Sequence, residues 1–309
     1  MKSYCGFIAI VGRPNVGKST LLNAILHKKV SITSHKPQTT RHRLLGIKTE
    51  GDYQMVFVDT PGLQPKTPRE LNKFMNQAAM SSLADVDVIL FLVEATGWRK
   101  SDDWVLEKIK KIGAPIVLGI NKIDLLENKE LLLPFIKQYA AKFNEIPDAE
   151  GVLPREGFDQ IIPFSAEKQV GLEELTEALR KYLPESPWYF PKDQTVDREE
   201  QFIVSEMIRE KLMRYLKEEL PYSLTVTLES FKKEDNILRI GALIWVEKDS
   251  QKAIVIGKGG SMLKKIGTLA RESIEKYTGE KVFLEMWVKV KKGWADDEKL
   301  LKQLGYEKD

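Results

Sequence analysis

The chain has 309 residues, of which 42% are hydrophobic and 30% charged, and its formal net charge is +3. This length predicts about two domains, and the composition argues against wholesale disorder and fibrous repeats. No run reaches the roughly 18 uncharged apolar residues of a transmembrane helix, and we expect no signal peptide. The single cysteine, Cys5, excludes an internal disulfide and a thiolate zinc cluster and fits a reducing cytoplasm.

Strand and helix signals alternate through residues 1–182, which we expect to form the first domain. Continuous apolar runs separated by helical spacing predict an α/β fold with a doubly wound, mostly parallel sheet. The two residues Gly51 and Asp52 form too short a turn for parallel neighbours, so the strands on either side should be antiparallel. The predicted strands are residues 7–11, 43–50, 53–58, 88–93, 116–120 and 161–164.

The first of these strands runs into a match to the phosphate-binding pattern G-x-x-x-x-G-K-[ST], and a helical pattern follows it. Glycines let successive backbone N–H groups point at phosphate oxygens, and the helix N-terminus adds partial positive charge. We expect Lys18 to bridge the β- and γ-phosphates and the Ser19 hydroxyl to bind Mg²⁺. The candidate nucleotide-binding residues in this segment are Gly12, Arg13, Pro14, Asn15, Val16, Gly17, Lys18, Ser19 and Thr20.

Residues 31–42 lie where a loop that senses the γ-phosphate would sit. Thr40 is the preferred candidate for a second hydroxyl on Mg²⁺, with Thr39 as the alternative; a Thr-rich entry into a strand is the non-functional interpretation. Together with residues 62–67, this segment would undergo the order–disorder change of a nucleotide switch.

The tetrapeptide Asp59-Thr60-Pro61-Gly62 follows the strand at 53–58. We expect Asp59 to support Mg²⁺ indirectly and the Gly62 N–H to meet the γ-phosphate. Leu63 comes next, where many switch GTPases place a glutamine that orients the attacking water. Leucine can neither donate nor accept a hydrogen bond, so unaided turnover should be slow.

Charge that develops during hydrolysis must then be met by other groups, and the catalytic candidates are Lys18, Thr40, Asn15 and Gly62. Asn15 is a candidate ligand for K⁺ in the position of an arginine finger. The alternative is that Asn15 only caps the loop.

Two later motifs point to guanine. In Asn121-Lys122-Ile123-Asp124, the carboxylate of Asp124 can accept from two guanine donors that adenine lacks. Asn121 can tie this loop to the phosphate loop. The segment Ser165, Ala166 and Glu167 would offer a backbone N–H to the guanine carbonyl. All four motifs follow predicted strands, and ligands of doubly wound sheets bind at the carboxyl ends of strands.

Residues 183–196 carry Pro184, Pro187 and Pro191 and are predicted to form an extended linker whose aromatic residues pack against a domain. Residues 197–309 should form a second, α+β domain with the order helix, strand, strand, short strand, helix, strand.

A Gly-rich turn lies between the predicted short strand and the second helix of that domain. Residues 252–271 contain five basic side chains and no acid. A glycine turn before a helix lets a sugar-phosphate backbone approach closely, so we expect this module to bind unpaired RNA rather than DNA. The alternative is an ordinary turn beside a solvated basic face. The candidate RNA-binding residues are Ile256, Gly257, Lys258, Gly259, Gly260, Lys264, Lys265 and Arg271.

With these motifs in this order, the whole chain resembles the Era family of bacterial GTPases, which carry a C-terminal KH domain of the type II order. The resemblance rests on residues 12–19, 37–42, 59–62, 121–124, 164–168 and 255–260. It implies a monomeric GTPase that uses Mg²⁺ and binds the 3′ end of 16S ribosomal RNA during 30S subunit maturation. It also implies that GTP rather than GDP favours RNA binding, and that some members contact the inner membrane peripherally. The alternative function is an RNA-binding adaptor in which hydrolysis is incidental.

Overall fold

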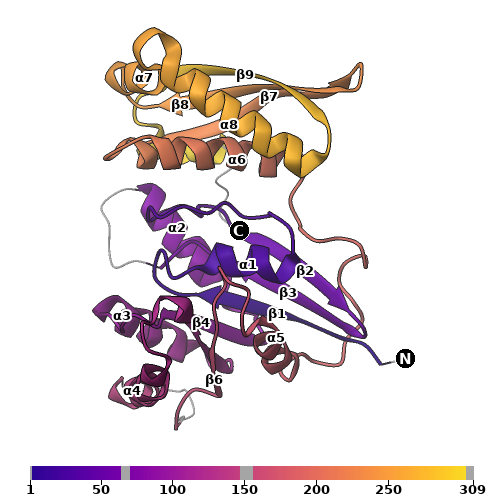
Figure 1. Ribbon diagram of the computed structural model, residues 1–309, viewed down its shortest axis with the longest axis vertical. Helices are drawn as coiled ribbons and strands as arrows, with labels where there is room; N and C mark the ends of the chain where they lie inside the picture. The colour runs from indigo at the N-terminus through magenta and orange to yellow at the C-terminus, as the bar shows by residue number, and fades with distance from the viewer. Residues whose placement is uncertain (1, 64–69, 147–155, 304–309) are drawn as a thin grey trace.

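A computed structural model of the chain describes residues 2–63, 70–146 and 156–303. Two bodies lie one above the other, the N-terminal α/β half and the C-terminal α+β half (Figure 1). Residues 64–67 of the expected switch lie outside the described residues. Within the described part of the chain, no helix is long and apolar enough to cross a bilayer.

The first half contains a six-stranded sheet with the order β2-β3-β1-β4-β5-β6. β2 pairs antiparallel with β3, as the short turn at Gly51 predicts, and the other neighbours are parallel. The sequence prediction of the fold class is confirmed. The strands are β1 (Tyr4–Val11), β2 (Leu44–Glu50), β3 (Tyr53–Asp59), β4 (Val88–Glu94), β5 (Ile116–Asn121) and β6 (Gln160–Pro163).

Helices cover both faces of this sheet because alternate strand residues are apolar on each side. Ile8 and Ile10 of β1 belong to the core on one face, and Ala9 and Val11 belong to the core on the other. The first face is covered by α1 (Lys18–Leu26) and α5 (Leu172–Arg180), and the second by α2 (Glu70–Ser81), α3 (Lys100–Ile109) and α4 (Leu132–Glu145).

The segment between the halves is extended and packs against the first half. Trp188 and Phe190 lie against a buried cluster that includes Cys5, in line with the sequence prediction. The buried amide of Gln54 holds this segment, since its Oε1 accepts from the N–H groups of Tyr189 (2.9 Å) and Phe190 (3.0 Å).

Further along, the same segment pairs with the outer strand β2. The N–H of Ile47 donates to the carbonyl of Thr195 (3.0 Å), and the N–H of Asp197 donates to the carbonyl of Leu45 (3.2 Å). The segment is therefore fixed to the sheet as far as Asp197, and the second half begins directly after it.

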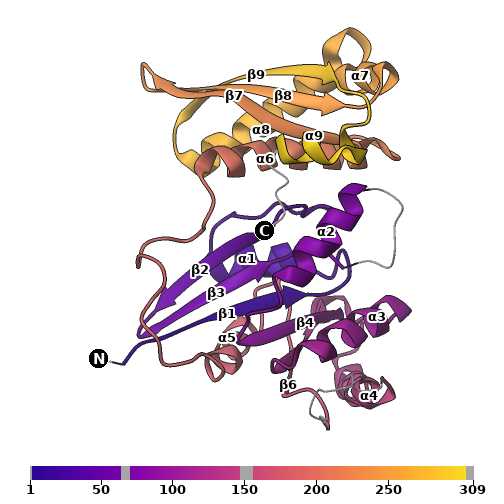
Figure 2. The ribbon, with the colours of Figure 1, turned by 180° about the vertical axis from the view of Figure 1, so that it is seen from behind.

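The second half is a three-stranded sheet with the order β7-β8-β9, covered on one face by two long helices. β7 and β8 are antiparallel, and β8 and β9 are parallel. Figure 2 shows the opposite face of this sheet in front of α8. The elements are α6 (Glu200–Tyr215), β7 (Leu224–Glu234), β8 (Ile237–Val246), α7 (Asp249–Ile256), α8 (Ser261–Thr278), β9 (Lys281–Val290) and α9 (Glu298–Gln303).

One element of this half differs from the sequence prediction. The expected short strand before the glycine turn is wrong, because residues 249–256 form the helix α7. Gln251 stabilises its first turn, since its Oε1 accepts from the N–H groups of Glu247 (2.8 Å) and Lys248 (3.1 Å). The apolar run that ends in Ile256 therefore makes up the last turn of a two-turn helix, of which only Val255 is buried and Ile254 is exposed.

Candidate nucleotide-binding site

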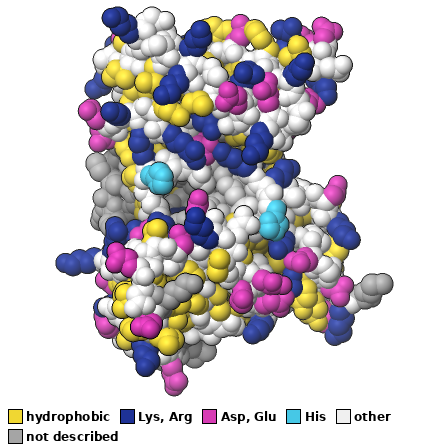
Figure 3. Space-filling view, viewed as in Figure 1, with side chains coloured by type: hydrophobic (Ala, Val, Ile, Leu, Met, Phe, Trp, Pro, Cys, Tyr) yellow, Lys and Arg dark blue, Asp and Glu magenta, His cyan; other side chains and the backbone are white. Residues whose placement is uncertain are grey.

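The carboxyl ends of the parallel strands open on a cavity of about 1110 Å³. Its volume lies slightly above the usual range for small-ligand sites, roughly 300–1,000 Å³. Figure 3 shows this side of the molecule hollowed between the two halves, with Lys and Arg side chains bordering the hollow. The predicted residues that line the cavity are Pro14, Asn15, Gly17, Lys18, Ser19, Thr20, Thr40, Gly62, Asn121, Lys122, Asp124, Ala166 and Glu167.

The other residues predicted to bind nucleotide lie behind this lining and are buried. They support the loops instead of presenting side chains to the cavity; for example, Thr60 donates its hydroxyl to the carbonyl of Ile10 (3.1 Å). These residues are Gly12, Arg13, Val16, Asp59, Thr60, Pro61, Leu63 and Ser165.

The phosphate loop folds over the side chain of Lys18. Its Nζ atom donates to the carbonyls of Gly12 and Arg13, both at 3.1 Å. Burial lowers the pKa of Lys18 to about 8, although the charge of the nearby Asp59 carboxylate acts in the opposite direction. Gly17 has φ 102°, and a Cβ there would lie 2.3 Å from Nδ2 of Asn121, so only glycine fits. The loop is therefore built to receive an anion.

Four oxygen-bearing side chains meet beside Lys18, those of Ser19, Ser31, Thr40 and Asp59. The Ser19 hydroxyl lies 2.9 Å from Oγ1 of Thr40 and donates to Oδ2 of Asp59 (3.0 Å). The Ser31 hydroxyl also donates to this Asp59 oxygen (2.8 Å). The other Asp59 oxygen, Oδ1, is buried without a hydrogen-bond partner among the described residues, and burial raises the pKa of this carboxyl. Hydroxyl and carboxylate oxygens around an unpartnered buried atom fit a hard cation such as Mg²⁺.

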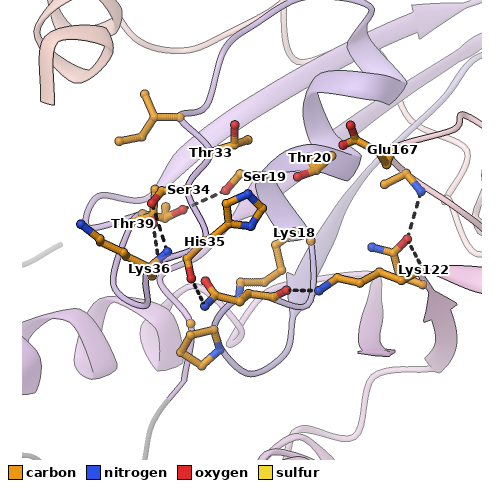
Figure 4. A pocket seen from close by; sticks show the side chains of 18 of the residues that line it. Lys18, Ser19, Thr20, Thr33, Ser34, His35, Lys36, Thr39, Lys122 and Glu167 are labelled. Carbon is orange, nitrogen blue, oxygen red and sulfur yellow. Dashed lines mark hydrogen bonds between the residues drawn. The ribbon is translucent and has the colours of Figure 1, made fainter. Parts of the chain in front are cut away.

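Asn15 and Lys122 connect the loops around the opening of the cavity. Figure 4 shows two residues of these loops, His35 and Lys122. The Asn15 amide donates to the carbonyl of His35 (2.7 Å), while Nζ of Lys122 donates to the carbonyl of Asn15 (2.8 Å). The nitrogen of this amide therefore caps a loop, which was one of the two expected roles. The K⁺ role stays a prediction.

The expected guanine loop is tied to the phosphate loop. The Asn121 amide donates to the carbonyl of Val16 (2.8 Å) and accepts from the N–H of Ala166 (3.0 Å). Ser165 donates its hydroxyl to Oδ1 of Asp124 and so orients this carboxylate toward the cavity that Asp124 lines. These contacts preorganise the loop before any base binds.

A buried charge network behind the phosphate loop has no counterpart in the sequence motifs. Arg13 pairs with Glu94 and lies 3.3 Å from Oδ1 of Asp102, and Lys122 pairs with Glu94 as well. Burial acts to raise the pKa of Glu94, but the hydrogen bonds from Lys122 and Arg13 outweigh burial and lower this pKa. Glu94 thus links two of the motifs, a role that only the folded sheet reveals.

Helix α6 of the second half holds the expected switch segment at several points. Glu210, which is fully buried, accepts from the N–H of Thr33 (3.0 Å) and pairs with Lys29 and Arg214. Arg214 also donates to the carbonyl of Thr33 (2.9 Å). These contacts fix the first part of the segment.

The second part of the segment is held next to Thr40. Arg209, also fully buried, donates to the carbonyl of Thr39, and Lys36 donates to the carbonyl of Leu216. The Arg41 guanidinium donates to the carbonyls of Leu224 (2.6 Å) and Pro221 (3.0 Å). The conformation that places Thr40 beside Ser19 therefore depends on both halves of the chain.

Two residues of α6 also line the cavity itself, Arg214 and Tyr215. Sequence reasoning missed them, because their helix is separated from the nucleotide motifs by most of the chain. The Lys265 ammonium lies 4.6 Å from the centre of the Tyr215 ring. Lys265, expected at the RNA surface, thus points to the interface between the halves.

A second cavity, of about 410 Å³, lies between α8 and β9. Gly260, Lys264 and Arg271 line it from the helix, and Leu284 and Met286 line it from the strand. Lys258 and Gly259 are exposed at its end, whereas Ile256 packs against the core and Gly257 ends α7. Gly259 has φ 59° and nothing within 4 Å of an added Cβ, so its backbone is open to a ligand.

Two family models match the chain. One, described as 50S ribosome-binding GTPase, covers residues 7–122, and one for the KH domain covers residues 219–295. Each match contains motifs whose geometry is described above.

Known proteins are similar to the chain over nearly its whole length. GTPase Era of Coxiella burnetii is 52% identical over 305 residues, which cover 99% of both chains. GTPase Era of Haemophilus influenzae is also 52% identical, over 306 residues that cover 99% of this chain and 97% of the relative. Two solved structures cover 99% of this chain and all of their own. One is an Aquifex aeolicus Era variant bound to GDP and AlF4⁻ (39% identity, TM-score 0.90), and the other is Era in complex with MgGDPNP and nucleotides 1506–1542 of 16S ribosomal RNA (40%, 0.91).

Proposed function

The chain belongs to the Era family of GTPases, and we propose that it binds the 3′ end of 16S ribosomal RNA through its KH domain and acts in assembly and maturation of the 30S subunit. The description of the GTPase family model mentions binding to the 50S ribosomal subunit. The RNA in the solved Era complex is instead 16S ribosomal RNA, which belongs to the small subunit. The groove between α8 and β9, with its open glycine turn, supports RNA as the ligand. We place the GTPase domain at residues 1–182, the linker at 183–196 and the KH domain at 197–309.

Hydrolysis of GTP rests on positioning and charge stabilisation, as phosphoryl transfer generally does. Lys18 would meet the phosphate charge, because its ammonium is held inside the phosphate loop by the carbonyls of Gly12 and Arg13. Gly62 borders the cavity and can present its N–H to the γ-phosphate. Since Leu63 is 1% exposed and packs in the core, it cannot orient water, and unstimulated turnover is slow.

Ser19 and Thr40 would hold Mg²⁺, with Asp59 behind them, because their oxygens converge beside an unpartnered carboxylate atom. The ion would supply positive charge to the β- and γ-phosphates. Arg209 would favour this position of Thr40 by holding the adjacent carbonyl of Thr39.

K⁺ would add a further charge at the opening of the cavity, with Asn15 as its ligand. The exposed position of Asn15 between the phosphate loop and His35 supports this role. Initial rates of hydrolysis should be higher in KCl than in NaCl, and Asn15→Ala should remove the difference. Equal rates of the unaltered protein in both salts would contradict the role.

Nucleotide and RNA binding are coupled in this proposal, and one observation carries it: α6 both lines the nucleotide cavity and supports the RNA-binding helix α8. GTP orders residues 31–42, and the ordered segment fixes α6. Calorimetry with RNA of nucleotides 1506–1542 should give a higher affinity with a GTP analogue than with GDP. Identical affinity with both nucleotides would contradict the coupling.

The second candidate function is that of an RNA-binding adaptor in which hydrolysis is incidental. Such an adaptor would also need nucleotide binding to be coupled to RNA binding. Thr40→Ala removes a hydroxyl beside Ser19 without disturbing the guanine loop. If this variant binds GTP and RNA, does not hydrolyse GTP and still supports 30S maturation in cells, the adaptor function is favoured. Loss of maturation favours the GTPase cycle.

The remaining proposals concern location and assembly. The resemblance supports a monomer in the cytoplasm that contacts the inner membrane peripherally and does not bind DNA. Flotation with anionic vesicles tests the membrane contact.

A further inference from the structure

The uncovered face of the KH sheet carries large exposed aromatic side chains. Phe283 and Trp287 of β9 are 46% and 45% exposed, although soluble proteins usually bury such residues. Helices α6 and α8 cover only the other face (Figure 2). The two residues are four positions apart on one strand, so their rings point to the same side of the sheet. The rise of a strand places them about 13 Å from each other.

The neighbouring strand adds a third ring and an open position. In the parallel register, Trp245 of β8 lies opposite Lys289, and Gly241 lies opposite Glu285. The Trp287 ring reaches over Gly241, where an added Cβ would come within 3.3 Å of it. The indole N–H of Trp245 donates to the hydroxyl of Thr227 (2.9 Å), which fixes its ring on the sheet. The three rings thus form an aromatic surface, which we call the sheet platform (Phe283, Trp287 and Trp245).

Basic side chains are interleaved with these rings. The Arg239 guanidinium lies 5.3 Å from the centre of the Phe283 ring, and the Lys289 and Lys291 ammonium groups lie 5.9 and 5.6 Å from the centre of the Trp245 ring. Two carboxylates pair with cations here, Glu229 with Lys289 and Glu234 with Arg239, and Glu285 is exposed between the rings. With Lys232 and Lys281 included, five cations face three carboxylates, which favours an anionic ligand. These cations are Lys232, Arg239, Lys281, Lys289 and Lys291.

The sheet platform is continuous with the RNA groove. β9 is the outer strand of its sheet, and its alternate residues Leu284 and Met286 line the groove between α8 and β9. A strand that leaves the groove across this outer edge therefore meets Phe283 and Trp287 within one residue of the groove lining.

We propose that the sheet platform is a second RNA-binding surface of this chain, on which unpaired bases stack after the RNA has passed over the edge of β9. Every base has an aromatic face, so stacking tolerates sequence, while the interleaved cations meet the phosphates. A KH groove clamps about four nucleotides. The platform would extend that contact, so this inference rests on the proposed RNA-binding function.

The test compares a long RNA, nucleotides 1506–1542 of 16S RNA, with oligonucleotides of about six residues tiled along it, by fluorescence anisotropy. Trp287→Ala and Phe283→Ala should each weaken binding of the long RNA about 5- to 150-fold, and leave the best short RNA unchanged. Trp287→Tyr should retain most of the affinity, because it keeps a stacking ring. Leu133→Ala, at a 69% exposed apolar residue on α4, is the matched control.

Gly259→Asp separates this inference from the function on which it rests. It places a carboxylate at the open turn of the groove and should weaken binding of both the short and the long RNA. If Gly259→Asp changes neither, the groove assignment fails. A different result would contradict the RNA-binding role of the sheet platform. In that result, Gly259→Asp weakens binding of both RNAs, whereas Trp287→Ala and Phe283→Ala keep the affinity for the long RNA and the melting temperature of the unaltered protein.

Discussion

Asp124 shows how a single carboxylate can decide which base the cavity accepts. Ser165 orients it, and Asn121 fixes its loop. Asp124→Asn replaces one of the two acceptor oxygens by a donor, so one guanine donor would be left unpaired in the site. We expect GTP affinity to fall on the order of 100-fold.

Xanthine nucleotide provides the control, because it presents a carbonyl where guanine has its amine. Competition binding should show that Asp124→Asn gains affinity for xanthosine triphosphate as it loses GTP. An unchanged base preference would contradict the assignment of Asp124.

Leu63 gives a second prediction at the residue scale. Glutamine at this position would not orient water, because the side chain lies in the core among apolar residues. Leu63→Gln should therefore destabilise the protein by about 1–3 kcal/mol without raising kcat, as measured by urea unfolding and phosphate release. Leu63→Met, which keeps the volume, should be tolerated; faster turnover in Leu63→Gln would show that the side chain reaches the phosphate.

The sequence motifs predicted most of the cavity lining because they are local. Phosphate loops and base-recognition loops are short segments whose spacing alone carries the chemistry. Glu94 and Arg214 could not be found in this way, since Glu94 meets Lys122 across 28 residues of sequence and Arg214 meets Thr33 across 181. For such residues, only the register of the sheet and the placement of α6 create the contact.

At the scale of elements, α6 is expected to support hydrolysis by holding the segment that carries Thr40. Arg209→Ala removes the donor to the carbonyl of Thr39. We expect GTP hydrolysis to be slower by about 10- to 150-fold and the Mg²⁺ concentration for half-maximal rate to be higher, because about 1.5–3 kcal/mol of a charged hydrogen bond is lost. Arg209→Lys should recover part of the rate.

The Mg²⁺ dependence distinguishes this role from a loss of stability. Gln201→Ala, at an exposed residue of the same helix, is the matched control and should change neither quantity. If Arg209→Ala lowers the melting temperature but leaves the Mg²⁺ dependence unchanged, Arg209 is only structural.

Glu210 should give this interface a characteristic pH dependence. Burial acts to raise the pKa of Glu210, but Lys29, Thr33 and Arg214 outweigh burial and lower this pKa below the usual 4.5. A carboxyl with a lowered folded-state pKa stabilises the fold above about pH 4.5, and the contribution is lost as pH falls through the lower value. Glu210→Gln should therefore cost about 1–3 kcal/mol at pH 7, less than a fully buried pair because Lys29 and Arg214 are partly exposed.

Thermal unfolding from pH 7 to pH 3 measures this effect. The difference in melting temperature between the unaltered protein and Glu210→Gln should shrink below about pH 4.5. A difference that stays constant over this range would show that the carboxylate charge contributes nothing.

The helix α7 marks the limit of prediction at this scale. Apolar runs of four residues do not distinguish a short strand from a short helix, and the side-chain cap of Gln251 supports the helix that the structure shows. Longer periodic elements such as α6 and α8 were predicted because 16 and 18 residues provide several turns of evidence.

For the whole molecule, composition and element order predicted two units, but not how they meet. The cluster of apolar residues around α1 and that around α6 and α8 form one continuous core. Neither half alone shows this, because the shared surface also buries charged residues such as Arg41 and Glu210, which local patterns assign to solvent.

The attachment of the linker to β2 determines how the second half can swing. Since the backbone is held as far as Asp197 and α6 begins at Glu200, rotation must be concentrated in the two residues between them. Helix α6 then acts as a lever about 24 Å long, pivoting at its first turn. A tilt of about 10° would move its far end by about 4 Å, so Arg214 would leave Thr33 while Phe202 stayed near its neighbour His42. Separation of the halves would thus begin at the nucleotide and spread back toward the pivot.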